Sequence, residues 1–548
     1  SVTGAVSLAS TLSVGGNATF AGDIRKSTAG TSNFAAGVNA GNSIESGGNY
    51  NVAVGDEAGT DITTGDYNTV LGYIAGDSIT TGGENTFLGY NSGGSNVSGN
   101  YNTFLGSGAG AATTGSDSTG VGRNAMTANT TGINVAVGYR ALDANTTGTS
   151  NVALGVDALG ANVAGDQSVA VGHEALIVQN PSGNADMNNV AVGYRAGYAT
   201  TTGTENTFIG ENAGSSNTTA SYNTAVGRIA LDANTTGADN VAVGRNALGA
   251  NTTASNNTAL GTNALNANTT GGTNTAVGIN SGYSVTTGSN NTFFGATSGD
   301  ATTTASQNTA LGSAALSANT TADNNTAVGF NALGANTTGI YNTAVGSQAG
   351  ASIAGDANYN TLIGTICGYA ITTGDDNTAV GRGALRTSTT ADKNTAIGSV
   401  ALEALTTGTQ NTIVGYGAGK AITTAGYSSA LGTNALLSQT TGGSNNAFGW
   451  GSADALTTGT DNQAFGNSAL GALTTGTQNV GIGRDALAAM TTTTGMVGIG
   501  YHAGKSLTTG LYNVIIGHSA GDAATEADHS TFVGYGAGSA VTTGDNNT

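Results

Sequence analysis

The fold is decided by a stretch that recurs along most of the chain, and one copy reads Asn325-Thr326-Ala327-Val328-Gly329-Phe330-Asn331-Ala332-Leu333-Gly334-Ala335-Asn336-Thr337-Thr338-Gly339. The glycine after the apolar pair, Gly329 in this copy, serves as an anchor (position 0), and other positions are counted from it. Anchors run from Gly55 to Gly534. Of the 28 intervals between them, 24 are 17 residues long, and the others are two of 16, one of 18 and one of 21. A fixed period of this kind indicates a repeat architecture.

Seventeen residues are too few for a pair of helices, and glycine-containing turns interrupt each copy twice. The anchor segment is a short apolar run typical of a β-strand. We therefore predict an all-β fold: a β-solenoid or β-roll of about thirty 17-residue coils, each with two short strands and two turns. The array covers residues 33–548, begins with a weaker copy at Gly37, and is expected to continue beyond Thr548. Residues 1–32 lack the anchor and are predicted to form a β-rich N-terminal connector.

Two positions of the repeat vary together. Position −2 is Ala in most coils but larger in nine, and in each of these nine coils position +4 is Gly. Where position +4 is Leu or Met, position −2 is Ala or Gly. Large and small residues thus exchange, which predicts that both positions share one pocket of nearly constant volume inside the coil. The nine larger residues are Val70, Phe87, Phe104, Phe208, Phe293, Leu362, Ile413, Ile515 and Phe532.

Other positions are more uniform. Position −1 is Val, Leu, Ile or Phe in all 29 coils, although it lies on the opposite face of the strand from position −2. A strand that is apolar on both faces needs a second layer, and a neighbouring copy of the chain is the simplest candidate. Position +3 is Ala in 24 coils and otherwise Ser or, once, Cys367, which predicts a closed site for a small residue. Asn at position −4 in 24 coils predicts an amide ladder, and the Thr-Thr-Gly turns predict a stacked threonine stripe.

Composition restricts the possible partners. The net charge of −19 disfavours binding to nucleic acid or to anionic membrane surfaces, and no apolar run is long enough for membrane insertion. We find no Ser/His/Asp set, no paired-carboxylate site and no Cys/His metal spacing among the 548 residues. We therefore expect no catalytic residues, no metal, no cofactor and no enzymatic activity. The single cysteine, Cys367, occupies a small-residue position and is predicted to be a buried, inert thiol.

Two features are candidates for surface contacts. The 21-residue interval between Gly172 and Gly193 contains an insertion with Asn180 and the only proline, Pro181, and is interpreted either as a contact loop or as a tolerated insertion. Aromatic residues also follow some anchors at position +1, where they could stack on sugars of a host surface or pack against neighbouring coils. The aromatic candidates are Tyr73, Tyr90, Tyr139, Tyr194 and Trp450, with further rings at Phe330, Tyr416, Tyr501 and Tyr535.

The pattern Asn-Thr-Ala-Val-Gly, followed by Ala at position +3, resembles the head repeat of trimeric autotransporter adhesins. Repeats of this kind with Thr-Thr-Gly also resemble those of bacteriophage tail fibres, and residues 12–24 are similar to fibre segments. The resemblance covers the array and implies a left-handed parallel β-roll with three chains side by side. The coil is longer here than in the adhesin heads.

The resulting hypothesis is a parallel homotrimeric rod, a structural fibre that spaces or presents receptor-binding parts, in the virion tail fibre of a phage. Its expected partners are further copies of itself, other virion or fibre proteins, and a host cell-surface glycan or protein. The first alternative is a trimeric adhesin on a bacterial cell surface. A less favoured alternative is an ice-binding solenoid with the Thr-Thr stripe as its binding face, although adjacent threonines on a strand diverge.

Overall fold

The computed structural model describes residues 29–548, so most of the predicted connector (residues 1–32) lies outside the described residues. The chain divides into two compact units, with the division between Phe208 and Ile209 in the sequence. Both units are parallel β-solenoids, and together they contain about 29 coils. No helix occurs in residues 29–548. The predicted fold class, an all-β solenoid with 17-residue coils, is therefore confirmed.

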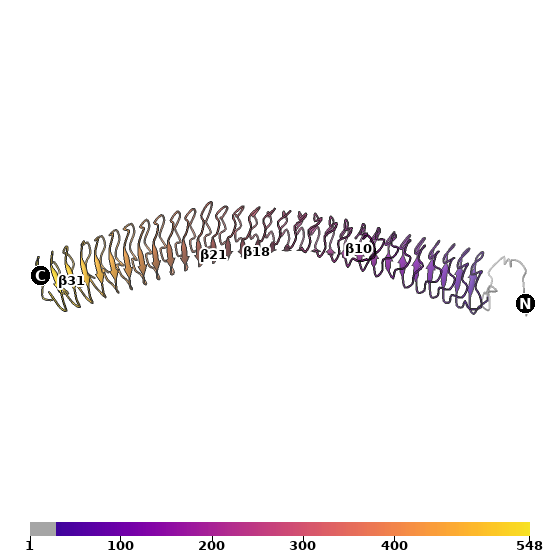
Figure 1. Ribbon diagram of the computed structural model, residues 1–548, viewed down its shortest axis with the longest axis horizontal. Helices are drawn as coiled ribbons and strands as arrows, with labels where there is room; N and C mark the ends of the chain where they lie inside the picture. Colours follow the sequence, from indigo (N-terminus) through magenta and orange to yellow (C-terminus); the bar gives the residue numbers. More distant parts are fainter. Residues whose placement is uncertain (1–28) are drawn as a thin grey trace, which may run out of the picture. The chain divides into compact units, whose positions relative to one another are not determined.

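Each coil contains one strand of three residues at positions −3 to −1 (Figure 1). The prediction of two strands per coil was wrong. Residues at positions +2, +4 and +12 adopt left-handed backbone conformations, such as Asn331 (φ 53°), Leu333 (φ 50°) and Tyr341 (φ 55°). Because an extended strand has negative φ values, these positions replace the second strand with a series of turns.

The strands of the first unit are β1 (Phe34–Ala36), β2 (Val52–Val54), β3 (Thr69–Leu71), β4 (Thr86–Leu88), β5 (Thr103–Leu105), β6 (Thr119–Val121), β7 (Val135–Val137), β8 (Val152–Leu154), β9 (Gly165–Asp166), β10 (Val169–Val171), β11 (Ala185–Asp186) and β12 (Val190–Val192). The boundary between the units falls within β13 (Thr207–Ile209).

The strands of the second unit are β14 (Thr224–Val226), β15 (Val241–Val243), β16 (Thr258–Leu260), β17 (Thr275–Val277), β18 (Thr292–Phe294), β19 (Thr309–Leu311), β20 (Thr326–Val328), β21 (Thr343–Val345), β22 (Thr361–Ile363), β23 (Thr378–Val380), β24 (Thr395–Ile397), β25 (Thr412–Val414), β26 (Ser429–Leu431), β27 (Asn446–Phe448), β28 (Gln463–Phe465), β29 (Val480–Ile482), β30 (Val497–Ile499), β31 (Val514–Ile516) and β32 (Thr531–Val533).

Within each unit, the strands of successive coils pair in parallel and in register. In β20 and β21, for example, Thr326, Ala327 and Val328 face the equivalent residues of the next coil. Equivalent positions therefore form columns along the solenoid, with a spacing of about 4.8 Å between neighbouring coils. A residue's nearest neighbours along its column lie 17 positions away in the sequence, so the period of the sequence becomes the register of the structure.

The core lies inside the coils, and it confirms the exchange of large and small residues. Phe293 at position −2 is fully buried, and a Cβ added to Gly299 at position +4 of the same coil would lie 2.5 Å from its Cε1 atom. The reverse arrangement occurs at Gly498 in position −2, where an added Cβ would lie 2.5 Å from Cγ of Leu487 at position +4 of the preceding coil. The pocket is therefore shared within a coil and also between neighbouring coils.

The predicted asparagine ladder at position −4 is also confirmed. Asn325 is fully buried, and its Nδ2 donates to the carbonyl oxygen of Gly339 at 2.9 Å, which closes the coil. Its Oδ1 accepts the backbone N–H of Asn342 in the next coil at 2.9 Å. Each such amide therefore satisfies buried backbone groups in two coils.

A second asparagine ladder, at position +7, was not predicted. Asn234, Asn251 and Asn268 donate in turn to the Oδ1 of the preceding member at 2.9 to 3.1 Å. The next residue in this column is Val285, and the buried Oδ1 of Asn268 has no partner. The recurrence of Asn in this column is the sequence signal that could have revealed the ladder.

The Thr-Thr-Gly turns stack as predicted. The first threonine of each pair, at position +8, uses its hydroxyl to bind the next coil, as when Thr269 Oγ1 donates to the carbonyl oxygen of Thr286 at 3.0 Å and Thr286 Oγ1 donates to that of Thr303 at 3.1 Å. The second threonine is exposed, as at Thr304 and Thr321. One half of the stripe therefore serves the internal hydrogen bonding of the solenoid.

Candidate interaction surfaces

The outer face of the sheet is formed by positions −3 and −1, whose side chains point away from the core. The residues at position −1 remain partly exposed in the single chain, with exposures of 47% for Leu260, 52% for Phe294 and 45% for Leu311. The interior of the coil covers only position −2. A large aliphatic or aromatic side chain therefore lies on this face in every coil, without a second layer from the same chain.

This outer face also lacks charge. None of the three-residue strands in residues 29–548 has Asp, Glu, Lys or Arg at position −3 or −1, although the chain carries 45 such residues. Position −3 is threonine in ten successive coils of the second unit, from Thr258 to Thr412. The face is thus a regular array in which a hydroxyl column runs beside an aliphatic column. Sequence reasoning missed the threonine column because it considered the Thr-Thr pairs instead.

Four of the five aromatic candidates have another ring or a guanidinium against their own ring. Tyr73 and Tyr90 occupy adjacent coils, and their rings stack with centroids 5.9 Å apart. The guanidinium of Arg123 lies 4.5 Å from the ring centroid of Tyr139. Tyr194 stacks on His173 with centroids 5.6 Å apart, and Arg195 also lies over its ring. These contacts are the packing between coils that was weighed against sugar binding, because they cover ring faces that a sugar would need.

Trp450 differs from these four. Its side chain is 58% exposed, and its column neighbours are Thr433 and Asn467, which have no rings. Within the second unit, no ring or guanidinium stacks on Trp450. Tyr416, two coils earlier in the same column, is 60% exposed. Trp450 is therefore the aromatic candidate whose ring stays available to a ligand.

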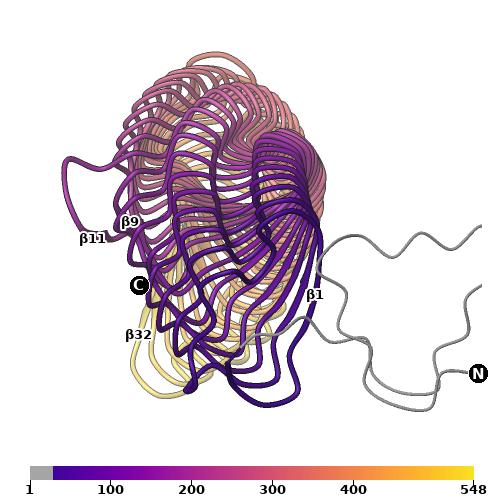
Figure 2. The same cartoon turned by 90° about the vertical axis from the view of Figure 1, so that its right-hand side faces the viewer.

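The insertion between Gly172 and Gly193 forms a small loop that is held to neighbouring coils by hydrogen bonds. β9 and β11 pair in parallel beside it, and the loop next to β11 projects beyond the turns of neighbouring coils (Figure 2). Asn180 is exposed but holds the loop, because its N–H donates to the carbonyl oxygen of Thr201 at 3.0 Å and its Oδ1 accepts the N–H of Val163 at 3.4 Å. Pro181 is half-buried, and Met187 is fully buried at the base.

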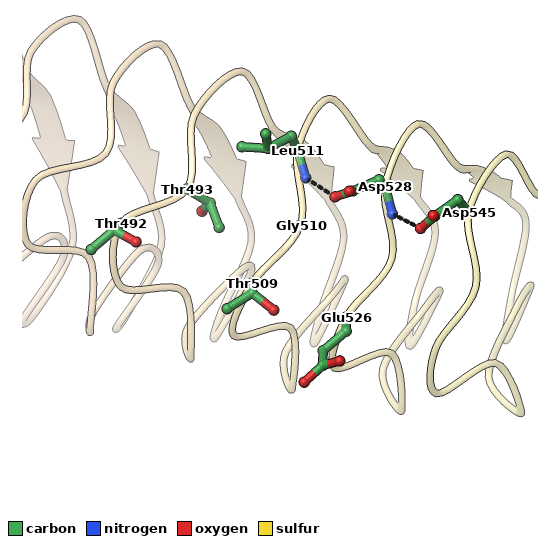
Figure 3. A pocket seen from close by; sticks show the side chains of 8 residues that line it. All are labelled: Thr492, Thr493, Thr509, Gly510, Leu511, Glu526, Asp528 and Asp545. Atoms are coloured by element: carbon green, nitrogen blue, oxygen red, sulfur yellow. Dashed lines mark hydrogen bonds between the residues drawn. The ribbon is translucent and has the colours of Figure 1, made fainter.

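Position +11 forms a further ladder that sequence reasoning missed. A side-chain oxygen at this position accepts a hydrogen bond from the backbone N–H of the same position in the preceding coil. The N–H of Leu511 donates to Asp528 Oδ1 at 2.7 Å, and the N–H of Asp528 donates to Asp545 Oδ1 at 3.1 Å (Figure 3). These residues line a polar hollow of about 480 Å³ together with Glu526 and Thr509. No group of three or more His, Cys, Asp or Glu residues in the described chain could hold a metal ion.

Aspartates at position +5 are half-buried, and burial disfavours the charged form of their carboxylates. Burial raises the pKa of Asp77, Asp232, Asp300 and Asp454, although backbone N–H groups near each carboxylate partly oppose this shift. One Asp300 oxygen is buried without a hydrogen-bond partner. These carboxylates accordingly favour the protonated form in the folded chain more than in the unfolded chain.

A shallow groove of about 610 Å³ crosses positions +5 and +6 in the second unit. Glu403 lies at its centre, 3.3 Å from Arg386 and 3.6 Å from Lys420, and Leu437 forms part of its wall. Both cations are about half exposed, so these pairs contribute little to stability. Both cations of the groove share one carboxylate, so its charged lining residues carry one excess positive charge.

The reactive side chains are dispersed. Cys367 is fully buried at position +3, its Sγ lies 3.3 Å from the carbonyl oxygen of Ala379, and burial raises the pKa of its thiol to about 12, which agrees with the predicted inert thiol. His502 contacts Asp485 at 3.1 Å, and His518 stacks between Tyr501 and Tyr535. These histidines thus make contacts between coils on the surface.

Among the described residues there is no helix with the length and apolar character needed to cross a membrane. Comparison with known protein families found no match, and no characterised protein matches the sequence either.

Proposed function

We propose that this protein is the repeat shaft of a homotrimeric fibre, most consistent with a phage tail fibre outside the cell, that spaces or presents parts which contact a host surface. Its proposed partners are two further copies of itself, other virion or fibre proteins, and a host glycan or protein. A trimeric adhesin on a bacterial surface is the alternative setting for the same architecture. The role is mechanical, since hydrogen bonds between coils and a dry core stiffen the chain.

The observation that carries this proposal is the uncharged outer face of the sheet. In an acidic chain, a column of half-exposed aliphatic and aromatic residues that continues from coil to coil within each unit is far larger than the scattered apolar groups of ordinary surfaces. Burial of this column by two other copies would remove it from water, and threonine at position −3 is compatible with such an interface because its methyl group packs. A second copy also presents the same repeat, so the columns would match along the interface.

The native mass of the full chain, measured by light scattering, tests the proposal. We expect three times the chain mass of 52.9 kDa. The double variant Val328→Glu, Val345→Glu places charges on the outer face of β20 and β21 and should shift the mass towards that of one chain. Thr304→Glu, Thr321→Glu is the matched control, because it adds the same charge at exposed turns. A single-chain mass for the native protein would overturn the proposal.

One observation favours a second candidate, an ice-binding face. Ten threonines at position −3, from Thr258 to Thr412, lie on one side of a parallel sheet at regular spacing, whereas the Thr-Thr stripe has half of its hydroxyls engaged internally. Both candidates need the same face. Native mass and thermal hysteresis therefore separate them: a single chain with thermal hysteresis supports ice binding, and a trimer without it supports the fibre.

A further inference from the structure

Position +1 in the second unit contains an alternation of ring, small residue and ring. Tyr416, Thr433 and Trp450 occupy this column in three successive coils, and all three are exposed. Tyr416 and Trp450 are among the most exposed aromatic residues in residues 29–548. The residue between them has no ring, so one coil without a ring separates the two aromatic residues in this column.

The geometry of the other rings in this column defines the space between these two. Where successive coils carry rings, the rings stack: Tyr501 on His518 at 5.0 Å, His518 on Tyr535 at 5.2 Å, and Tyr73 on Tyr90 at 5.9 Å, with at most 30° between their planes. One ring therefore fills one coil spacing. Tyr416 and Trp450 are two coil spacings apart, about 9.6 Å. Thr433 replaces the middle ring of such a stack and leaves room for one ring above its side chain.

The sides of this space are open and polar. Gly417 and Gly451 follow the two rings at position +2, so no side chain closes the slot there. A Cβ added to Gly451 would meet no atom closer than 3.6 Å. The Oδ1 of Asn434, in the coil between the two rings, lies against Gly417. The slot thus has two aromatic walls, the Thr433 hydroxyl on its floor and the Asn434 amide at its rim.

We propose that Tyr416 and Trp450 bind one pyranose ring of a glycan between them. A pyranose presents C–H groups on both faces and hydroxyls around its edge, which matches two aromatic walls with a polar floor and rim. Two contacts of about 4.8 Å each fall within the range for stacked rings. The choice of a glycan as the ligand rests on the proposed function, because a fibre would present this slot to the glycans of a host surface.

The chain contains its own matched controls. Phe330 occupies the same column and is 56% exposed, but its neighbours are Ser313 and Ser347 and no second ring lies two coils away. Phe330→Ala should therefore leave binding unchanged. Thr433→Tyr inserts the middle ring and recreates a three-ring stack like that around His518, so it should preserve the fold while it fills the slot.

Trp450 is the only tryptophan of the chain, so intrinsic fluorescence reports on the slot directly. The labelled full chain is first screened on an array of pyranose-containing bacterial and animal glycans, and each positive oligosaccharide is then titrated while tryptophan emission is recorded. We expect a saturable change in emission. Tyr416→Ala should weaken binding about tenfold, and Thr433→Tyr should abolish it.

The inference is overturned if no array signal of the native chain is lost in Thr433→Tyr, or if that variant binds a titrated oligosaccharide as tightly as the native chain does. Far-UV circular dichroism and native mass of each variant verify that the coils are intact. A trimer without a Thr433-sensitive signal removes the slot and keeps the fibre. A single chain with such a signal keeps the slot and removes the trimeric fibre.

Discussion

Exchanging the sizes of Phe293 and Gly299 tests the shared pocket that holds each coil together. Phe293 is fully buried at position −2, and its ring occupies the space where a side chain on Gly299 would lie. Phe293→Ala empties this space and should lower the free energy of unfolding by about 3–5 kcal/mol. Gly299→Leu alone places a Cβ 2.5 Å from the Phe293 ring and should cost about 1–3 kcal/mol or more through overpacking.

The double variant Phe293→Ala, Gly299→Leu restores a combination that the chain already uses. Ala327 and Leu333 occupy the same two positions two coils later, and Leu333 has the left-handed backbone that the leucine of Gly299→Leu would need. We expect the double variant to cost only about 1–2 kcal/mol, because the pocket next to Gly282 of the preceding coil stays partly empty. The two substitutions should therefore rescue each other strongly.

Hydrogen–deuterium exchange measured by mass spectrometry is the suitable assay. In a repeat protein each coil opens with its neighbours rather than with the whole chain, so peptides from residues 289–307 report the local free energy. Peptides from distant coils serve as internal controls. Additive effects, in which the double variant exchanges at least as fast as Phe293→Ala, would refute the idea that the two positions share one pocket.

Three further predictions concern the ladders and the titratable groups. Asn325→Ala leaves the buried backbone N–H of Asn342 in the next coil without an acceptor and removes one of the two amide donors to the carbonyl oxygen of Gly339, because Asn336 Nδ2 still donates to that oxygen. It should therefore destabilise its coil by about 1–3 kcal/mol, and unchanged exchange of the 325–342 peptides would contradict this. Because burial raises the pKa of Asp300, the folded chain binds a proton at this carboxylate more readily than the unfolded chain does, and stability should fall as the pH rises from about 3.8 through the raised pKa. Asp300→Asn should therefore raise the melting temperature at pH 7 and leave it unchanged at a pH below that window. An equal shift of the melting temperature at both pH values would refute the assignment. The Cys367 thiol is buried and its pKa is about 12, so it should react with a thiol reagent at pH 8 only after the chain is denatured. If Cys367 of the native chain is labelled at the rate of a free thiol, the thiol is not buried.

Much of the fold could be read from the sequence because the neighbours of a residue in a solenoid are its own equivalents in adjacent coils. The exchange between Phe293 and Gly299, and the ladder through Asn325, were visible as columns of residues 17 positions apart. The second strand was predicted wrongly for a local reason. Leu333 has a left-handed backbone that disfavours any residue with a Cβ, and only the burial of its side chain in the shared pocket offsets that cost.

The surfaces were less predictable. The rings of Tyr73 and Tyr90 lie 17 positions apart in the sequence, so their stacking could have been anticipated. Two other contacts depend on side-chain directions that the sequence spacing does not define. These are the Arg123 guanidinium over the Tyr139 ring and the hydrogen bond from the Val163 N–H to the Asn180 side chain. The opening between Tyr416 and Trp450 becomes apparent only when the stacked rings elsewhere in the column show how much space one ring fills.

By itself, the sequence determined the coil length, the register, the parallel stacking and the columns that face the core, because each of these repeats every 17 residues and each copy reinforces the others. Only the tertiary structure decided that each coil has a single three-residue strand, that the hydroxyls of Thr269 and Thr286 are engaged while Thr304 is exposed, and that Leu260 and Phe294 stay half exposed. The physical reason is that these outcomes depend on turn conformations and on the direction of each side chain, which are set by packing between coils and not by the pattern of apolar residues.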